Sequence, residues 1–588
     1  MPIALALLAM LLCSPSLFIG RIIDDDFHQL ALTGNEQLPE SARSPAELFA
    51  FIGERWTLPP DGIPWWASED LHLAFFRPLS GFSHWLDYQL WPDDPRWMHL
   101  QSILWLGLTV FAAATLFRRL EAPGALWVGG LSAVLFALDE AHALPTAWLA
   151  NRNALLSMFF GLLALLAYHR GRSESWRPGA FFAPVCLLLA VLSGEAAVAC
   201  GAYLLSYALF LDRGALRDRL TALVPCAGTG VIWYAAYKAM GYGTGGSATY
   251  IDPGSEPLRF LSAVVERGPV LLWAQFGFPP ADLYNFLSQA QAHRAWLAMV
   301  AGLALLGLLL VPLLRRDRLA RFWTLGLFLS VLPICSIIPS SRLLFYVSLG
   351  GAGLLARGLV AAWRHGERTT MWHWATRGLT VPLVLVHLIL APMGVWTTAA
   401  NWVAMSRFFS KPAASLPNDP AVAMQQVVIV NAPSAFITAY APVYQAVRGH
   451  TIPRFTTTLA TSLYAIEVHR PGPRTLRVRP LGGFIAPRGS APVEQQAQPF
   501  RFGYIFQAMD TMYRAPEGFR VGQRIEQPGM VLEVTALTEG DRPLEVTFHF
   551  DRPLEAPSWR WLQWENNEFA AWQPPAVGET VTLPAIDW

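Results

Sequence analysis

Long apolar segments constrain the fold of this chain more than any other feature of its sequence. We predict membrane spans near residues 3–19, 98–117, 124–139, 153–169, 180–193, 196–212, 219–240, 295–314, 322–338, 343–362 and 379–396. Apolar residues fill these blocks instead of recurring at amphipathic spacing, and about 20 such residues cross a bilayer core. The chain is 53% hydrophobic and 14% charged, whereas soluble domains are about a quarter charged. The sequence therefore predicts a polytopic α-helical membrane protein with about eleven transmembrane helices.

Arginines alternate between the two sides of this predicted topology. One set of loops carries Arg118, Arg119, Arg170, Arg172, Arg177, Arg213, Arg217, Arg219, Arg315, Arg316, Arg318, Arg321, Arg364, Arg368 and Arg377. The opposite short loops carry only Arg152 and Arg342. Cytoplasmic loops are enriched in arginine, so the N-terminus is predicted to be cytoplasmic in an inner (plasma) membrane. The alternative that residues 3–19 form a signal peptide leaves the side of the following loop unchanged.

The chain divides into two predicted domains. Residues 1–396 form the transmembrane domain, and its loop 20–97 is the first periplasmic loop. After about residue 412 short alternating segments appear, at 427–430, 475–478, 500–506, 531–537 and 544–550. Glycine and proline separate them, which predicts a periplasmic β-rich domain over 412–588. The net charge of +1 gives no basic field that would favour a nucleic-acid partner.

Three consecutive acids, Asp24, Asp25 and Asp26, follow the first span. Adjacent like charges repel, so these carboxylates need a cation, a substrate or water as a partner. The topology predicts that further polar residues lie on the same side of the membrane: His28, Arg77, Asn151, Arg152, Glu195 and Arg342. Such a set can bind a metal and an anionic lipid headgroup. Alternatively, these residues are interfacial caps and ion pairs that stabilise the helix bundle.

Several motifs occur in a fixed order over roughly the first 360 residues. They are the acids after the first span, Phe76-Arg77-Pro78-Leu79, Leu86-Asp87-Tyr88, His99-Leu100, Ala147-Trp148-Leu149-Ala150-Asn151-Arg152-Asn153, Leu192-Ser193-Gly194-Glu195 and Ser341-Arg342-Leu343-Leu344-Phe345-Tyr346. Together they resemble the GT-C superfamily of membrane glycosyltransferases. More narrowly, they are similar to the protein O-mannosyltransferase-like proteins with transmembrane and TPR repeats. The chain resembles a bacterial member that lacks those helical repeats of about 34 residues.

The resemblance implies a glycosyltransferase that uses a polyprenyl-phosphate-linked sugar donor on the non-cytoplasmic face. By matching position, Asp25 takes the role of general base, with Asp24 and Asp26 as neighbours. These two are also the candidate ligands of a divalent cation, Mg²⁺ or Mn²⁺. The implied substrate-binding residues are His28, Arg77, Asn151, Arg152, Glu195 and Arg342. Among them, Arg152 and Arg342 are the candidates for the donor phosphate, because a guanidinium can bind it with two parallel hydrogen bonds. Gly194 departs from the family pattern, which has a lysine there.

Two other classes of function remain open from the sequence. A transporter or flippase of a lipid-linked molecule predicts polar groups near mid-span and paired repeats in the two halves. A catalytically degenerate lipid-binding scaffold predicts the same fold without a working base. The sequence identifies neither the sugar nor the acceptor, which is a protein, a lipid or a glycan.

Overall fold

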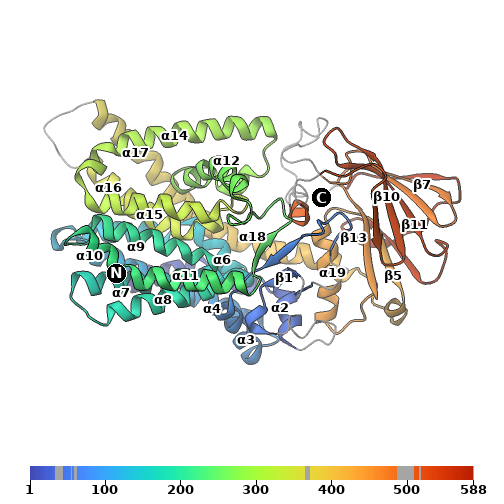
Figure 1. Ribbon diagram of the computed structural model, residues 1–588, viewed down its shortest axis with the longest axis horizontal. Coiled ribbons are helices and arrows are strands. Elements are labelled where there is room, and N and C mark those ends of the chain that lie inside the picture. Colours follow the sequence, from blue (N-terminus) through green and yellow to red (C-terminus); the bar gives the residue numbers. More distant parts are fainter. Residues whose placement is uncertain are drawn as a thin grey trace.

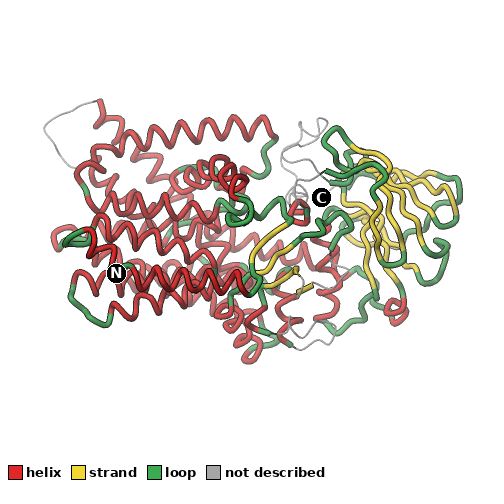
Figure 2. The backbone as a smooth tube through the Cα atoms, in the orientation of Figure 1, coloured by secondary structure: helices red, strands yellow, loops and turns green. Residues whose placement is uncertain are grey.

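The computed structural model describes residues 1–33, 44–53, 56–57, 63–363, 371–485, 509–514 and 518–586. The molecule is elongated, with a bundle of helices at one end and β-sheets at the other (Figure 1; Figure 2). The predicted order of an apolar helical part followed by a β-rich part is confirmed.

The helices up to the middle of the chain are α1 (Pro2–Leu12), α2 (Asp24–Leu32), α3 (Pro78–Leu90), α4 (Pro95–Leu120), α5 (Leu126–Ala137), α6 (Ala143–Ala147), α7 (Arg152–Ser173), α8 (Gly179–Ser193), α9 (Val198–Phe210), α10 (Leu216–Thr221) and α11 (Val224–Ala239). The later helices are α12 (Pro257–Phe276), α13 (Ala281–Tyr284), α14 (Gln289–Arg316), α15 (Arg318–Ile334), α16 (Phe345–Trp363), α17 (Met371–Leu385), α18 (Ala391–Ala414) and α19 (Ala435–Val447).

Every predicted span falls on a helix, but only some of these helices are long and apolar enough to cross a membrane. Within the described residues there are 5, or 6 if the bent pair Pro123–Ala137 and Glu140–Ala147 forms one span. The five are Pro95–Leu120, Leu149–Ser173, Gln289–Arg316, Ser341–Trp363 and Trp374–Ala414. The predicted number of about eleven is therefore not confirmed. The last of these helices also continues through residues 396 and 412, the two predicted domain boundaries.

Helix α12 lies between the predicted spans 219–240 and 295–314, where no helix was expected from the apolar segments. Charged residues interrupt its apolar sequence, so it forms no continuous hydrophobic block. Arg267 is buried and donates to the Cys335 carbonyl at 3.0 Å, while Leu258 and Leu261 are exposed. The helix packs against α14 and α15. An amphipathic pattern of this kind produces a helix without the hydropathy signal of a span.

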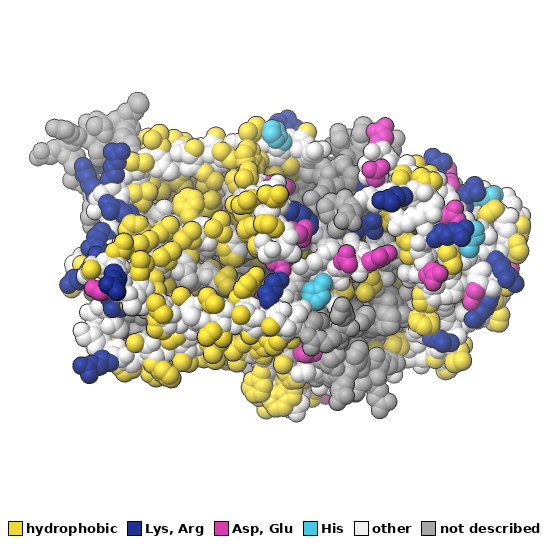
Figure 3. All heavy atoms as spheres, in the orientation of Figure 1, with side chains coloured by type: hydrophobic (Ala, Val, Ile, Leu, Met, Phe, Trp, Pro, Cys, Tyr) yellow, Lys and Arg dark blue, Asp and Glu magenta, His cyan; other side chains and the backbone are white. Residues whose placement is uncertain are grey.

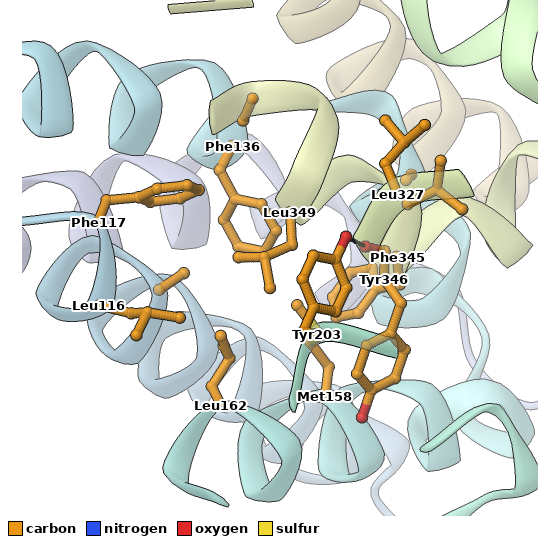
Figure 4. Packing of buried hydrophobic residues seen from close by; sticks show 14 of the residues in the cluster. Leu116, Phe117, Phe136, Met158, Leu162, Tyr203, Leu327, Phe345, Tyr346 and Leu349 are labelled. Atoms are coloured by element: carbon orange, nitrogen blue, oxygen red, sulfur yellow. Dashed lines mark hydrogen bonds between the residues drawn. The ribbon is translucent and has the colours of Figure 1, made fainter. Parts of the chain in front are cut away.

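The core of the helical part is a single large cluster of apolar side chains from α4, α5, α7, α9, α15 and α16. Two buried tyrosines of this cluster, Tyr203 and Tyr346, have hydrogen-bond partners for their hydroxyl groups (Figure 4). Tyr203 Oη donates to the Tyr346 carbonyl at 2.5 Å and accepts from Gly350 N at 2.9 Å. Tyr346 Oη donates to the Ser157 carbonyl at 2.8 Å. These bonds satisfy hydroxyl groups that would be costly to bury alone.

The described strands are β1 (Ala50–Gly53), β2 (Trp56–Thr57), β3 (His72–Ala74), β4 (Gly243–Gly245), β5 (Gln426–Ala432), β6 (Phe455–Thr461), β7 (Ile466–Gly472), β8 (Thr475–Pro480), β9 (Arg524–Gln527), β10 (Met530–Leu537), β11 (Pro543–Phe550), β12 (Trp559–Glu565), β13 (Glu568–Ala571) and β14 (Thr580–Leu583). Four of the predicted strand segments are confirmed as β5, β8, β10 and β11. The fifth, 500–506, lies outside the described residues.

Three sheets result from these strands. The C-terminal part holds a six-stranded sheet in the order β14-β7-β8-β11-β10-β9 and a four-stranded sheet in the order β13-β12-β5-β6. Strand β5 pairs in parallel with both β12 and β6, and α19 connects β5 to β6. A small sheet, β2-β1-β3-β4, joins the first loop to the segment after α11. It lies between the helical bundle and the β-rich part (Figure 1).

The first loop and the C-terminal part share one hydrophobic core. Trp65 packs edge-on against Phe484 and Phe548, and its Nε1 donates to the Leu459 carbonyl at 2.9 Å. Trp66 is 0% exposed. Burying aromatic side chains of this size contributes a few kcal/mol each to stability. The two regions are therefore held together by packing although they lie at opposite ends of the sequence.

The surface changes in character along the long axis (Figure 3). On the face shown, hydrophobic side chains cover most of the helical bundle, and charged side chains of both signs are scattered over the β-rich end. Lysine and arginine side chains also gather at the end of the bundle farthest from the β-sheets. Ion pairs connect the loops at that end, for example Arg119 with Glu174 and Arg172 with Asp212. An apolar band between two charged ends is the surface expected of a membrane protein.

Candidate functional site

The three consecutive acids occupy the first turn of α2 and point in different directions. Successive residues of an α-helix are about 100° apart around its axis, so adjacent side chains do not share a face. Asp24 lines a large cavity. Asp25 faces the protein interior and is 1% exposed, and Asp26 lies near Arg21 and Arg448. The three carboxylates therefore do not form one cluster.

Asp25 is held by backbone amides. Its Oδ2 accepts from Ile22 N at 3.0 Å and its Oδ1 accepts from Ala150 N at 2.8 Å. It does not line the cavity, and burial raises its pKa well above the usual value. Asp25 was expected to be the general base. In the structure its carboxylate instead links α2 to the turn before α7 through these two hydrogen bonds. Asp24 is the acid of this group that faces open space.

Asp26 lies between two arginines. Arg21 Nε and Arg448 Nη1 are each 3.7 Å from its Oδ1. Asp26 was also a candidate metal ligand together with Asp24, but the helix turns the two carboxylates apart. In the part of the chain that the structure describes, no group of three or more His, Cys, Asp or Glu side chains could hold a metal ion.

The cavity has a volume of about 380 Å³ and lies where the bundle meets the first loop. It brings together five of the residues that the sequence predicted as functional: Asp24, Arg77, Asn151, Glu195 and Arg342. The ends of α15 and α16 supply an apolar wall that includes Ile334, Ile337 and Leu343. Aromatic side chains from the first loop, including Phe49 and Phe75, form another side. The cavity is thus polar in one region and apolar in the other.

Arg342 supplies a positive charge to this cavity. Its Nη1 donates to Asn151 Oδ1 at 3.5 Å, and its guanidinium lies 5.4 Å from the centre of the Trp148 ring. Among the described residues, no carboxylate lies within 4.0 Å of this guanidinium. Glu195, another acid of the cavity, pairs with a different arginine.

That other arginine is Arg77. Its Nε donates to Glu195 Oε2 at 2.7 Å. The guanidinium also lies 4.5 Å from the ring centre of Phe75 and 5.2 Å from that of Phe49. An ion pair fixes both side chains, and the aromatic rings restrict the arginine further. Arg77 and Glu195 therefore form a fixed, internally neutral part of the cavity wall.

Arg152 does not reach the cavity. Its side chain is fully buried and pairs with Asp87 Oδ2 at 2.5 Å. It also donates to Ser102 Oγ at 2.9 Å and to the Met98 carbonyl at 2.7 Å. Every side of this guanidinium is occupied by protein acceptors. The expected phosphate contact at Arg152 is therefore replaced by a structural role, since an unpaired buried charge would be very costly.

His28 also lies outside the cavity. Its ring is 1% exposed and packs against Phe49 at 4.9 Å and His84 at 5.1 Å between ring centres. Burial lowers its pKa to about 3, assisted by the positive charges of Arg77 and Arg152. The imidazole is therefore uncharged at neutral pH, and it is not among the residues that line the cavity.

The pKa of the Asp24 carboxyl is suited to a group that accepts a proton. Burial raises its pKa to about 6, while a hydrogen bond from Tyr440 and the positive charges of Arg342 and Arg77 lower it. A carboxyl with this pKa is mostly ionised at neutral pH and is a stronger base than an exposed aspartate. It is therefore placed and charged to accept a proton from a group in the cavity.

The sequence analysis missed three residues of this site. Lys238 and Asp252 form an ion pair that lines the cavity, and Tyr440 donates to Asp24 Oδ1. Lys238 is one of only two lysines in the chain, and this rarity could have marked it as a candidate site residue. Tyr440 gave no such signal, because 416 residues separate it from Asp24.

Comparison with known proteins adds little to this geometry. No family model and no curated protein matches the sequence. Among solved structures, the chain is similar to the one described as the crystal structure of ArnT from Cupriavidus metallidurans in the apo state. The identity is 13%, the match covers 76% of this chain and 88% of that chain, and the TM-score is 0.39. A likeness at that score establishes neither a shared fold nor a shared activity.

Proposed function

We propose that this protein is a membrane glycosyltransferase of the GT-C type. It transfers a sugar from a polyprenyl-phosphate-linked donor to a protein, lipid or glycan acceptor on the non-cytoplasmic face. The observation that supports this proposal most directly is the cavity itself. It joins the Asp24 carboxylate, the Arg342 guanidinium and an apolar wall within one space. The sequence motifs that resemble the GT-C superfamily supply several of its residues.

The two regions of the cavity match the two parts of such a donor. A polyprenyl chain is apolar and would lie against Ile334, Ile337 and Leu343. The phosphate carries negative charge and would bind Arg342, which has no carboxylate partner among the described residues. Asn151 lies beside that guanidinium and would orient it or the phosphate. A site with one apolar and one cationic region suits an amphipathic anion.

The proposed chemistry uses Asp24 as the general base. Its carboxylate takes the proton of the acceptor hydroxyl while the acceptor oxygen bonds to the anomeric carbon of the sugar. The bond from that carbon to the phosphate oxygen breaks, and the phosphate keeps the electron pair. Arg342 stabilises the negative charge that develops on the leaving phosphate. Arg77 and Glu195 would contact the sugar from the fixed wall. These reaction steps require only side chains that line the cavity.

The alternatives predict different arrangements of polar groups. A flippase needs them along a path through the membrane, whereas the charged residues of this cavity come from helix ends, from the first loop and from the segment after α11. A degenerate scaffold would bind the lipid without transferring a sugar. Measuring the release of polyprenyl phosphate from a labelled donor separates the scaffold from the transferase.

Replacement of Asp24 tests the proposal directly. The full chain is reconstituted in lipid nanodiscs with synthetic polyprenyl-phosphate hexoses that carry a radiolabelled sugar. Water and a membrane extract of the source cells serve as acceptors. We expect the wild type to release polyprenyl phosphate, and Asp24→Asn to do so about 10²- to 10⁴-fold more slowly, because general-base catalysis contributes about that factor.

Asp93→Asn is the matched control for this experiment. Asp93 is an exposed acid of the same loop and lies outside the cavity. We expect it to keep the wild-type rate. Undecaprenyl phosphate binding without release from any donor would support the scaffold instead. Release by Asp24→Asn at the wild-type rate would show that Asp24 is not the base.

A further inference from the structure

Helix α19 of the C-terminal part packs directly against α2, the helix that carries Asp24. The two helices lie close together where the bundle meets the β-rich end (Figure 1). Tyr440, near the middle of α19, donates its hydroxyl proton to Asp24 Oδ1. A residue of the C-terminal part therefore contacts the acid that faces the cavity.

The position of α19 is fixed at both of its ends. At the N-terminus, Ala435 N donates to Asp510 Oδ1 at 2.9 Å, and Ser434 Oγ donates to the same oxygen at 2.5 Å. Near the C-terminus, Gln445 Nε2 donates to the Ala413 carbonyl at 2.8 Å, which is at the end of α18. Buried hydrogen bonds of this kind restrict the helix, because breaking them leaves polar groups unpaired.

The side chain of Tyr440 is restricted as well. Its ring packs against Phe436, one turn earlier, with 4.9 Å between ring centres. Its hydroxyl engages only one oxygen of Asp24. The other oxygen, Oδ2, has no hydrogen-bond partner within the described part of the chain, and Asp24 lines the cavity. One carboxylate oxygen is thus anchored while the carboxylate still borders the space where an acceptor would bind.

We propose that Tyr440 is a positioning residue for Asp24, and that the C-terminal β-rich part thereby completes the active site. This inference rests on the proposed function, since it assigns a role to a residue that contacts the proposed base. General-base catalysis needs the carboxylate within hydrogen-bond reach of the proton that it removes. A carboxylate on a short side chain can rotate, and a supporting hydrogen bond reduces that freedom.

Tyr440→Phe tests the inference, because it removes the hydroxyl and keeps the aromatic ring. Two quantities are measured on full-length protein in nanodiscs: the dissociation constant for undecaprenyl phosphate and the rate of polyprenyl phosphate release from the labelled donors. We expect the dissociation constant to stay within about 2-fold of wild type and the rate to fall about 10- to 100-fold, the range for losing one hydrogen bond to a charged group. A purely structural contact would not separate these two quantities.

Tyr444→Phe is the matched control. Tyr444 lies one turn further along α19, and its ring contacts Arg448 and not Asp24. We expect it to keep both the wild-type rate and the wild-type affinity. The thermal unfolding temperature of each variant is recorded in the same preparation.

Each remaining outcome contradicts the inference in a distinct way. Release by Tyr440→Phe at the wild-type rate, while Asp24→Asn is inactive, rejects the role of Tyr440 and leaves the proposed function in place. Unfolding of Tyr440→Phe, but not of Tyr444→Phe, shows that the bond serves the fold and not the base. If the wild type releases no polyprenyl phosphate from any donor, the proposed function and this inference both fail.

Discussion

Arg342 is the residue whose replacement tests the proposed donor site most directly. Its guanidinium lies beside Asn151 and over the Trp148 ring at the edge of the cavity. We expect Arg342→Ala to weaken undecaprenyl phosphate binding by about 1.5–3 kcal/mol, the contribution of one charge-assisted hydrogen bond. Arg342→Lys should weaken it less, since lysine keeps the charge and loses the two-pronged geometry. The measurement is a binding titration in nanodiscs.

Arg96→Ala is the control for the Arg342 variants. Arg96 is exposed and lies outside the cavity, and its removal should leave the affinity unchanged. Equal affinity of Arg342→Ala and wild type would reject the phosphate contact and leave Arg342 as a contact within the bundle.

From the sequence we could predict only which polar residues lie on one side of the membrane. Which of them line the cavity depends on the direction of each side chain, and the sequence does not give it. Asp24 and Asp25 are neighbours, yet one lines the cavity and the other caps backbone amides. Asn151 and Arg152 diverge in the same way at the start of α7, where Arg152 pairs with Asp87. The register of a helix depends on what it packs against, and the sequence motifs contain no such information.

At the level of elements, hydrophobic blocks predicted where helices form, but not which of them are long enough to cross a membrane or where they end. Each block became a helix, because a continuous apolar segment must satisfy its backbone groups internally in a membrane. The same pattern failed for α12, whose apolar sequence is interrupted by charged residues such as the buried Arg267. It also gave no indication that α18 continues as one helix toward the β-rich part. Helix length is set by packing partners beyond the apolar segment.

Close packing of α16 against α9 and α15 leads to a prediction about Gly350. A Cβ atom there would lie 2.7 Å from Leu327 Cβ and from Tyr203 Oη, and 2.8 Å from the Trp323 carbonyl oxygen. We therefore expect Gly350→Ala to destabilise the protein by about 1–3 kcal/mol through overpacking. The measurement is thermal unfolding of the detergent-solubilised protein. In Gly201→Ala, on α9, the new Cβ meets no atom within 4 Å, so this control should be neutral or slightly stabilising. Equal stability of Gly350→Ala and wild type would show that α16 can move away from its neighbours.

At the scale of the whole molecule, the β-rich part could be predicted from its sequence pattern, but its connection to the first loop could not. Trp65 and Phe484 pack in one core although more than half of the chain separates them. Trp65 and Trp66 of the first loop are both buried in this core. Sequence periodicity reports which residues are buried locally and not which distant segment buries them.

The orientation of the molecule in the membrane gives the last prediction. The arginine-rich loops lie together at the end of the bundle opposite the β-sheets, as the ion pair of Arg357 with Glu121 and Asp317 illustrates (Figure 3). Because arginine is enriched on the cytoplasmic side, the β-rich part should be periplasmic.

Single cysteines are introduced at Asp93, Arg217 and Glu539 in a background without the five native cysteines. We expect a membrane-impermeant maleimide to label Asp93→Cys and Glu539→Cys in cells whose inner membrane is intact. Arg217→Cys should react only after that membrane is permeabilised. The reverse pattern would place Asp24 and the cavity on the cytoplasmic side, where the proposed lipid-linked donor would not be used.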